Sequence, residues 1–414
     1  MKILYVLLDG VGDRADKRLN YLTPLEASFT PNLDFFARNS KAGSVISVKE
    51  GIAPESDMAV FNMLGYSFDD YFGRGIVEAL GADMKFENGN LALRGNFATV
   101  DDSLNIIDRR VGRNLSNKEG EELVEELKNK LKLEGVDWEL KHTVGHRVVL
   151  VIKAKEKLSA NISNTDPAYE KSKGVSIALE KIEELKVKEC KALDKDDSSK
   201  RAEKIVNEFT KRAHEILRES SVNKKRKERG FLPANVILLR DASDRVPKLK
   251  SIKEKYNLNF ACLADMPVEL GIAKLTGMKT FKQKVGEDYS KIGKRALELL
   301  KEFDGVYVHI KGPDEFGHDG EPLKKKAIIE QIDRKFFGEI REVNLSNNTL
   351  IVSADHSTPC QLKVHSDDPV PLIVSNSLLI RDKVCRFNER EVKKGSLGLI
   401  HGKEVLGRAL SLIS

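Results

Sequence analysis

The sequence predicts an α/β fold, a mostly parallel sheet with helices on both faces, together with an inserted, smaller α+β domain. The first observation is a buried strand at residues 2–8, and the second is a regular alternation of strands and helices after about residue 250. Such alternation is typical of a parallel sheet with helical crossovers. Between these two parts the pattern changes to short strand-like pieces and one long, charged stretch. We therefore expect a first domain from residues 1–85 and 240–414, and an inserted domain from residues 86–239.

The N-terminal part begins with an apolar, β-rich run that ends at Asp9. No small-residue cleavage site follows the run, so a buried first strand explains it better than a signal peptide does. A helix is predicted near residues 31–39, where Thr30 precedes a proline suited to the first helical position. A second helix is predicted to start within residues 54–57 and to end near Gly65.

The remaining elements follow from short apolar runs and from amphipathic stretches between them. In the expected insert, strands are predicted at 91–98, 147–152 and 235–240, and a charged helical stretch at 176–229. Beyond the insert, strands are predicted at 259–264, 305–310 and 349–354, and helices are predicted up to residue 275, at 288–302 and at 321–343.

Composition and charge argue against several classes of protein. No run of about 18 apolar residues is present, so we expect no spanning helix and no membrane partner. The four cysteines form no CxxC pair, which argues against a zinc knuckle or a disulfide framework and favours a cytoplasmic location. The net charge of +6 is a local excess, and the basic run at 224–229 contains no aromatic residue, so no nucleic-acid partner is expected. That run fits a solvated helix end better than a polyanion site. The oligomeric state stays open, a homo-oligomer included.

Acidic and imidazole side chains follow the predicted strands at their carboxyl ends, where ligands collect in a parallel sheet. Asp9 ends the first strand, and the later strands lead to two further groups: Asp314 with His318, and Asp355 with His356, followed by His365. Each alone is a weak signal, because an aspartate after a strand is more often a turn former or a helix cap. Their common placement at strand ends is what indicates a metal site.

A pair of divalent cations would suit this mixture of carboxylates and imidazoles. Mn²⁺ is the first expectation, with Zn²⁺, Co²⁺ or Mg²⁺ as alternatives, although the preference of Mg²⁺ for oxygen ligands fits less well. Asp314 and His318 are four residues apart, so one helical turn would bring them to the same ion. Two cations about 4 Å apart can hold the attacking and leaving oxygens of a phosphoryl transfer.

Ser56 is the candidate nucleophile. A serine hydroxyl is weakly nucleophilic at neutral pH, and a cation at its oxygen would favour the alkoxide. The N-terminus of the helix that begins near Ser56 would attract the charge of a phosphate. Taken alone, a serine in this position is more often a helix cap.

The expected insert carries a second group of candidates, in which arginine predominates. Arg109, Arg110 and Arg113 lie within six residues, and His146 and Arg147 are adjacent. Arginine forks bind carboxylates and phosphates through paired hydrogen bonds, so this group suits a small, doubly anionic substrate. Surface ion pairing is the alternative explanation for each arginine. His309, within a predicted strand, is better explained as a core or sub-site residue than as a ligand.

Several of these stretches together resemble a known family. They are GIAPESDMAV at 51–60, GRG at 73–75, DRRVGR at 108–113, TVGHR at 143–147, ISNTDP at 162–167, HIKGPDEFGHDG at 309–320 and SADHSTPC at 353–360. The chain is similar, over nearly its whole length, to the archaeal-type cofactor-independent phosphoglycerate mutases of the alkaline phosphatase superfamily.

The resemblance implies an alkaline-phosphatase-like domain with two metal ions and a smaller domain that grips the substrate. One ion would be held by Asp9, Ser56, Asp355 and His356, and the other by Asp314, His318 and His365. Ser56 would carry a phosphoserine intermediate. Phosphoglycerate would be bound by Arg109, Arg110, Arg113, His146, Arg147 and Lys311.

The implied reaction interconverts 3-phosphoglycerate and 2-phosphoglycerate in glycolysis and gluconeogenesis, without free bisphosphoglycerate. Closure of the inserted domain would exclude water and retain the glycerate. The nearest alternative is a metal-dependent phosphatase or phosphodiesterase of the same superfamily. A metal-stabilised binding protein without catalysis is an alternative of another class.

Overall fold

A computed structural model describes residues 2–67, 70, 73–172, 175–179, 184–343 and 345–413. The chain forms two compact units, the first from residues 1–71 and 249–414 and the second from residues 72–248. The expected insert, 86–239, lies within the second unit, which also includes helix α4 (Arg74–Gly81).

An eight-stranded mixed sheet forms the centre of the first unit. Its order is β11 (Lys279–Lys282), β10 (Phe260–Ala264), β12 (Gly305–Ile310), β1 (Lys2–Leu8), β13 (Asn348–Ser353), β14 (Val370–Ser375), β2 (Ser40–Ile46) and β15 (Gly398–His401). The strands from β11 to β13 are parallel, β14 is antiparallel to both of its neighbours, and β15 is parallel to β2. The prediction of a mostly parallel α/β sheet is confirmed.

Strand β1 lies between β12 and β13, and its register decides which residues meet beyond the sheet. Leu8 pairs with Ile310, and Leu7 pairs with Ser353. All three strands run in the same direction, so the residues after them emerge at one edge. Six of the seven residues of β1 are buried, which explains why its sequence is apolar without alternation.

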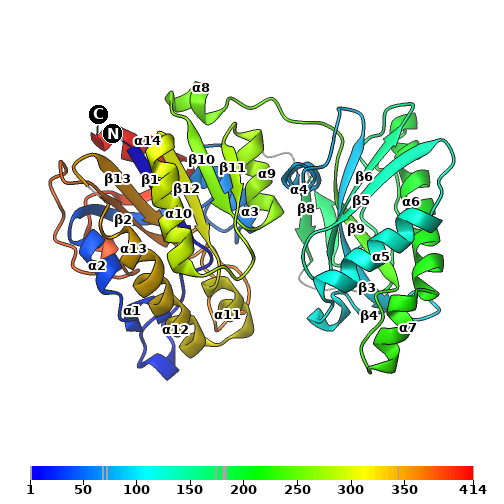
Figure 1. Ribbon diagram of the computed structural model, residues 1–414, viewed down its shortest axis with the longest axis horizontal. Coiled ribbons are helices and arrows are strands. Elements are labelled where there is room, and N and C mark those ends of the chain that lie inside the picture. The colour runs from blue at the N-terminus through cyan, green and yellow to red at the C-terminus, as the bar shows by residue number, and fades with distance from the viewer. Residues whose placement is uncertain are drawn as a thin grey trace. The chain divides into compact units, whose positions relative to one another are not determined.

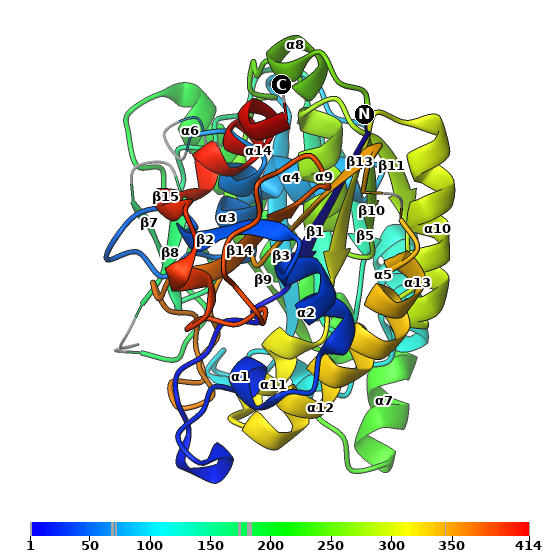
Figure 2. The ribbon, with the colours of Figure 1, turned by 90° about the vertical axis from the view of Figure 1, so that its left-hand side faces the viewer.

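Helices cover both faces of this sheet (Figures 1 and 2). One face carries α2 (Pro31–Ala37), α10 (Tyr289–Glu302), α12 (Pro322–Ile332) and α13 (Gly338–Ile340), and the other carries α3 (Ser56–Met63), α9 (Pro267–Leu275) and α14 (Val405–Ile413). Shorter helices are α1 (Pro24–Ala27), α8 (Ile252–Tyr256) and α11 (Pro313–Asp319). Both chain ends lie at the same end of the unit.

The helix predicted at 321–343 is not continuous. It consists of α12, a π-helical turn at Asp333–Phe337 and the short α13. At this wider turn the buried carboxylate of Asp333 accepts hydrogen bonds from the main-chain N–H groups of Leu33 (2.7 Å) and Asn32 (3.3 Å). The turn therefore supplies a carboxylate to the first turn of α2, where helix N–H groups lack partners.

An antiparallel sheet forms the centre of the second unit. Its strands are β4 (Ile106–Asp108), β3 (Leu91–Val100), β6 (Arg147–Ala154), β5 (Val136–His142) and β9 (Val236–Ser243), with β9 paired to β3. Leu91 and Leu93 pack towards α5 (Asn117–Lys130) and α6 (Asp197–Arg218), whereas Ala92 packs towards α4. Both faces are thus covered, and all ten residues of β3 are buried.

The helical prediction for 176–229 was wrong in its first part. Residues 175–178 belong to strand β8, paired with β7 (Tyr169–Ser172), and α6 begins only at Asp197; residues 180–183 lie outside the described residues. The irregular segment before α6 is held by main-chain hydrogen bonds, including Lys188 N–H to the Thr165 carbonyl and Leu193 N–H to the Asn161 carbonyl. Charge density alone therefore did not indicate a helix.

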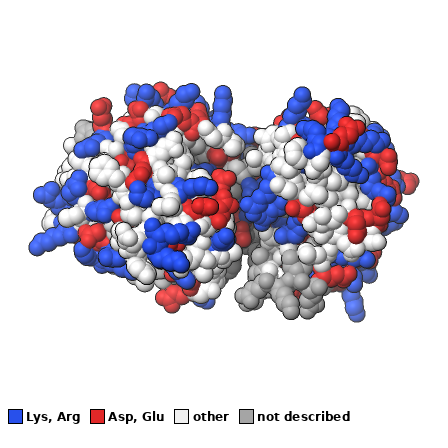
Figure 3. Space-filling view, turned by 90° about the horizontal axis from the view of Figure 1, so that it is seen from below, with Lys and Arg blue, Asp and Glu red and all other residues white. Residues whose placement is uncertain are grey.

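The basic run 224–229 lies in and just after α7 (Ser221–Glu228), and part of it is structural. Arg226 is fully buried and donates hydrogen bonds to Glu119 (2.9 Å) and to the Leu232 carbonyl (2.9 Å). Figure 3 shows basic and acidic side chains interspersed over the visible faces of both units. None of the described helices is both long and apolar enough to cross a membrane.

Candidate active site

Three neighbouring strand ends supply one cluster of charged side chains in the first unit. Asp9 follows β1, Lys311 follows β12, and Asp355 and His356 follow β13. Asp9, Asp355 and His356 are almost inaccessible to solvent. The parallel register therefore brings together the residues that sequence analysis placed at strand ends.

Helix α11 adds two further members. Asp314 and His318 lie one turn apart, and Oδ2 of Asp314 is 3.5 Å from Nε2 of His318. His365 comes from the loop after β13, and its Nε2 lies 3.5 Å from Oδ1 of Asp314. Its ring is stacked on that of His356 at a centroid distance of 3.8 Å.

Two groups of side chains offer donor atoms close enough together to hold metal ions. One is Asp9, Asp355 and His356, and the other is Asp314, His356 and His365, with the donor atoms of each group within 4.8 Å of one another. His318 adjoins the second group, since its Nε2 is 3.2 Å from Nε2 of His365. The structure thus brings together all six Asp and His residues that sequence analysis assigned to metal.

The orientation of the two loop-facing imidazoles fits a cation. Nδ1 of His365 lies 2.8 Å from the Pro54 carbonyl, and Nδ1 of His318 lies 2.9 Å from the Lys363 carbonyl. A carbonyl oxygen only accepts, so both Nδ1 atoms carry hydrogen, and in the neutral rings both Nε2 atoms carry lone pairs. Without metal, the hydrogen bond and charge of Asp314 outweigh burial and raise the pKa of His365 to about 9, so a proton occupies this position. A cation that replaced this proton would face the lone pairs of both neutral rings and the Asp314 carboxylate.

A buried oxygen without a hydrogen-bond partner indicates a cation site in the group formed by Asp9, Asp355 and His356 as well. Among the described residues, Oδ1 of Asp9 has no hydrogen-bond partner, although it is inaccessible to solvent. Burial raises the pKa of Asp9 to about 8. Burial also lowers the pKa of His356 to about 4, so that imidazole is neutral at neutral pH, as a metal ligand must be. The residues therefore fit a divalent cation.

Ser56 is the first residue of α3, and the preceding Glu55 is the N-cap. Its Oγ lies 3.1 Å from Nε2 of His356, so the hydroxyl borders both donor groups. The alternative explanation of Ser56 as the helix cap therefore does not apply. A hydroxyl at a helix N-terminus beside a candidate metal site is suitably placed to attack a phosphate.

The buried Glu269, which sequence analysis did not assign to the site, links His309 and Lys311 beside the metal-binding candidates. His309 places Nε2 3.3 Å from Oδ2 of Asp355 and Nδ1 3.1 Å from Oε1 of Glu269. Lys311 bridges Glu269 (2.8 Å) and Asp9 (2.9 Å). Burial alone would raise the pKa of Glu269, but the charges of Lys311 and His309 outweigh it and lower that pKa to about 2. The only signal in the sequence was an acid in the otherwise apolar stretch PVELGIA.

The second unit has an arginine cluster of its own, which we define as Arg74, Arg94, Arg109, Arg110, Arg147 and Arg240. Arg109 grips the buried carboxylate of Asp166 through two hydrogen bonds (3.0 and 2.7 Å), and Arg240 donates a third (2.9 Å). The ring of Tyr169 lies 5.4 Å from the Arg109 guanidinium and 4.4 Å from that of Arg240. Asp166 belongs to the motif at 162–167 but was not assigned a role.

The positive charge of the arginine cluster is only partly neutralised. Among the described residues, Glu78 pairs with Arg74 (2.9 Å) and Arg94 (3.5 Å), Asp166 pairs with Arg109 and Arg240, and Asp241 lies 3.5 Å from Arg240, so three carboxylates face six guanidinium groups. Burial and the positive charges of Arg147, Arg110, Arg240 and Arg94 together lower the pKa of His146 to about 3. The imidazole is therefore neutral, and the cluster has an excess of guanidinium groups suited to an anion. Arg113 is exposed beside the cluster, in a short 3₁₀ turn.

Comparisons with known proteins identify the family of this chain. Residues 37–223 match the family model described as 2,3-bisphosphoglycerate-independent phosphoglycerate mutase. The chain is 41% identical to the enzyme of that name from Aeropyrum pernix, and the match covers 100% of both chains. The chain belongs to this family. Membership makes it an enzyme of the isomerase class.

Another curated relative and two solved structures match over nearly their full lengths. The 2,3-bisphosphoglycerate-independent phosphoglycerate mutase 1 of Methanocaldococcus jannaschii is 36% identical, with 99% of this chain and 97% of the relative covered. The solved structure of the cofactor-independent phosphoglycerate mutase from Thermoplasma acidophilum is 31% identical, with a TM-score of 0.65 and complete coverage of both chains. The PH0037 protein of Pyrococcus horikoshii is 29% identical, with a TM-score of 0.82 and coverage of 100% and 97%.

Proposed function

We propose that this mutase interconverts 3-phosphoglycerate and 2-phosphoglycerate through a phosphoserine at Ser56. The observation that carries the proposal is the position of the Ser56 hydroxyl at the start of α3, bordering two groups of Asp and His donors. The names of the full-length relatives supply the substrate.

Two divalent cations, with Mn²⁺ as the first candidate, would be held by the two donor groups. Asp9, Asp355 and His356 would hold one, and Asp314, His318 and His365 the other, with Ser56 beside them. When bound, such cations supply the positive charge that stabilises the phosphoryl group and favours ionisation of the serine.

The chain's own residues would carry the transfer in two steps. In the first, the bond from Ser56 Oγ to phosphorus forms as the bond from phosphorus to the substrate oxygen breaks, and the serine proton ends on the released glycerate hydroxyl. In the second, the other glycerate hydroxyl attacks the phosphoserine and its proton returns to Ser56. Lys311, bridging Asp9 and Glu269, adds a positive charge beside the serine's neighbours. The arginine cluster would bind the anionic glycerate between the steps.

A coupled assay tests this function together with its dependence on metal. We expect the protein to form 2-phosphoglycerate, detected by enolase, with Mn²⁺ and without added bisphosphoglycerate. A sample stripped with a chelator and then freed of it should lose turnover by about a hundredfold or more and regain it with Mn²⁺. Release of inorganic phosphate faster than isomerisation would instead identify a phosphatase.

Arg110 is the member of the arginine cluster best placed to test anion binding without disturbing the fold. It is exposed, and its main-chain N–H, rather than its guanidinium, donates to Asp108 (2.6 Å). We expect Arg110→Met to raise the KM for 3-phosphoglycerate by about tenfold or more, because a charge-assisted contact is worth about 1.5–3 kcal/mol. Steady-state kinetics measure the change.

The matched control is Arg212→Met, on α6 of the same unit, where the arginine pairs with Glu208 at the surface. This variant should keep the wild-type KM. An unchanged KM in Arg110→Met, or an equal rise in both variants, would remove Arg110 from the substrate site.

A further inference from the structure

The hydroxyl of Thr358 lies between members of the two donor groups. It donates a hydrogen bond to Oδ1 of Asp314 (2.6 Å) and lies 3.1 Å from Nδ1 of His356. Thr358 is fully buried, in the loop that follows β13.

The hydrogen count of this contact fixes the state of the His356 ring. A hydroxyl has one hydrogen, and here it is given to a carboxylate. Towards Nδ1 of His356 the hydroxyl can therefore only accept, so Nδ1 carries the ring hydrogen. In the neutral ring, Nε2 then carries the lone pair. That atom lies 3.5 Å from Oδ1 of Asp9 and 3.4 Å from Oδ2 of Asp355, where a cation would be bound.

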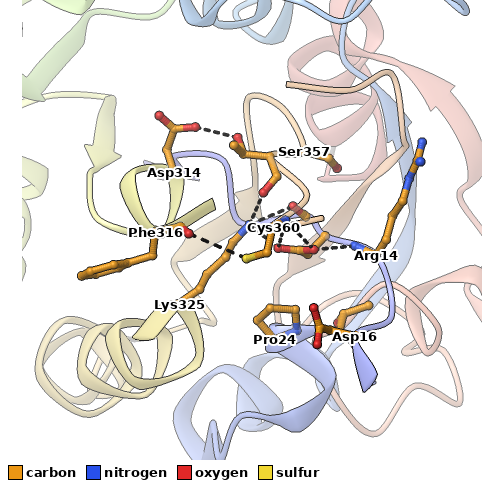
Figure 4. A network of polar contacts seen from close by, with 12 residues as sticks. Arg14, Asp16, Pro24, Asp314, Phe316, Lys325, Ser357 and Cys360 are labelled. Carbon is orange, nitrogen blue, oxygen red and sulfur yellow. Dashed lines mark hydrogen bonds and ion pairs between the residues drawn. The ribbon is translucent and has the colours of Figure 1, made fainter. Parts of the chain in front are cut away.

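A buried ion pair fixes the main chain of Thr358. Nζ of Lys325, from α12, donates to the Thr358 carbonyl (2.9 Å), the Gly12 carbonyl (3.1 Å) and Oδ2 of Asp13 (2.8 Å), which uses all three of its hydrogens (Figure 4). Both members of the pair have fully buried side chains. The carboxylate of Asp13 also accepts from the Cys360 main-chain N–H at 3.1 and 3.2 Å. On the other side, the Thr358 main-chain N–H donates to the Gly12 carbonyl (3.0 Å), so the loop is held both before and after the Thr358 side chain.

The packing around the hydroxyl leaves it little freedom. A Cβ on Gly10 would lie 2.6 Å from Oγ1 of Thr358 and 2.7 Å from Oδ1 of Asp314, and Gly10 has a φ of +58°. A Cβ on Gly317, in α11, would lie 2.4 Å from the Thr358 carbonyl. Two glycines thus allow α11 and the loop after Asp9 to approach Thr358 closely, which sets the hydroxyl's distances to both side chains.

We propose that Thr358 is a positioning residue for both metal groups, anchored by Lys325. Its hydroxyl selects the ring form of His356 that offers Nε2 to one cation, and it orients Asp314 for the other. The inference rests on the proposed metal site. Because the single hydroxyl of Thr358 contacts both His356 and Asp314, its removal should weaken the binding of both cations.

The test compares Thr358→Val, which keeps the shape and removes the hydroxyl, with Thr358→Ser, which keeps the hydroxyl. We expect calorimetric titration with Mn²⁺ to show affinity about 10–100-fold weaker for the valine variant, the usual effect of losing a hydrogen bond to a metal ligand, and close to wild type for the serine variant. Wild-type affinity in a folded valine variant would overturn the inference. Absence of Mn²⁺ binding by the wild-type protein would overturn the proposed function instead.

A second measurement uses the metal-free protein, so it does not depend on loading. In ¹⁵N-histidine-labelled protein, NMR of the ring nitrogens should show the His356 hydrogen on Nδ1 in the wild-type and serine proteins. His356→Gln assigns the resonance. In Thr358→Val this preference should be reduced, since Nδ1 loses its acceptor. A wild-type ring with its hydrogen on Nε2 would overturn the inference, even if the valine variant failed to fold.

Discussion

Ser56→Ala should lower mutase turnover by about four orders of magnitude or more, with the fold and Mn²⁺ binding largely retained. The expected loss is large because alanine offers no oxygen to accept the phosphoryl group, and removal of a catalytic serine costs about a millionfold in a well-studied hydrolase. The fold should tolerate the change because Glu55, and not Ser56, is the N-cap of α3. The variant loses one hydrogen bond, between Oγ and His356, worth about 1 kcal/mol.

The experiment combines kinetics with trapping. Acid quenching of the wild-type enzyme with ³²P-labelled 3-phosphoglycerate should label the peptide containing Ser56, and the alanine variant should carry no label there. Ser411→Ala, at an exposed position of α14 in the same unit, is the control and should retain both turnover and labelling. Substantial turnover by Ser56→Ala, with a label elsewhere or none, would contradict the serine mechanism.

The strand ends of the first unit could be predicted because a buried parallel strand is a continuous apolar run in the sequence. Strands β1 and β12 have the predicted bounds, since each is an apolar run that stops at a polar or glycine-containing turn. Because these strands pair in parallel, the residues that follow them, Asp9, Asp355 and Asp314, lie at one edge of the sheet. Strand β2, with the sequence SKAGSVI, was not predicted, because small and polar residues give it neither an apolar run nor an alternation.

Residues that act through partners distant in sequence were beyond the reach of pattern analysis. Glu269, in α9, contacts Lys311, which follows β12. Asp166, in the segment before β7, contacts Arg240 in β9. Lys325, one of three consecutive lysines, resembles a solvated helix face in the sequence, yet it is fully buried against Asp13. No spacing rule connects such pairs, because tertiary packing alone determines which charge receives a partner and which stays in water.

Asp355→Asn should remove the metal site while leaving the loop in place. Oδ1 of Asp355 accepts hydrogen bonds from the main-chain N–H groups of Gly10 (3.0 Å) and His356 (2.9 Å), and the amide oxygen of asparagine can keep both. The amide nitrogen would then replace Oδ2, the oxygen that faces His309 and His356. A ligand oxygen becomes an NH₂ group that cannot bind a cation.

The loss of charge acts in the same direction as the loss of the ligand atom. Burial would raise the pKa of Asp355, but His356 (which is charged only in acid), the hydrogen bond and charge of His309, and the charge of Lys311 hold it well below its usual range, so the native group is ionised. We expect Mn²⁺ affinity about 100-fold weaker or worse, and mutase turnover at least about a thousandfold lower at a fixed, modest Mn²⁺ concentration. Calorimetric titration and the enolase-coupled assay measure the two effects separately.

Asp333→Asn is the control that separates metal binding from the general cost of altering a buried aspartate. Asp333 is as deeply buried in the same unit, and its two carboxylate oxygens accept from main-chain N–H groups of α2. Asparagine can replace only one of these acceptors, so this variant should unfold at a lower temperature yet bind Mn²⁺ as the wild type does. If both variants bound Mn²⁺ normally, Asp355 would not be a ligand. If both lost it equally, the loss would reflect stability and not the site. The expected contrast, weak binding in a stable Asp355→Asn and normal binding in a destabilised Asp333→Asn, follows only if the carboxylate after β13 is there for the cation.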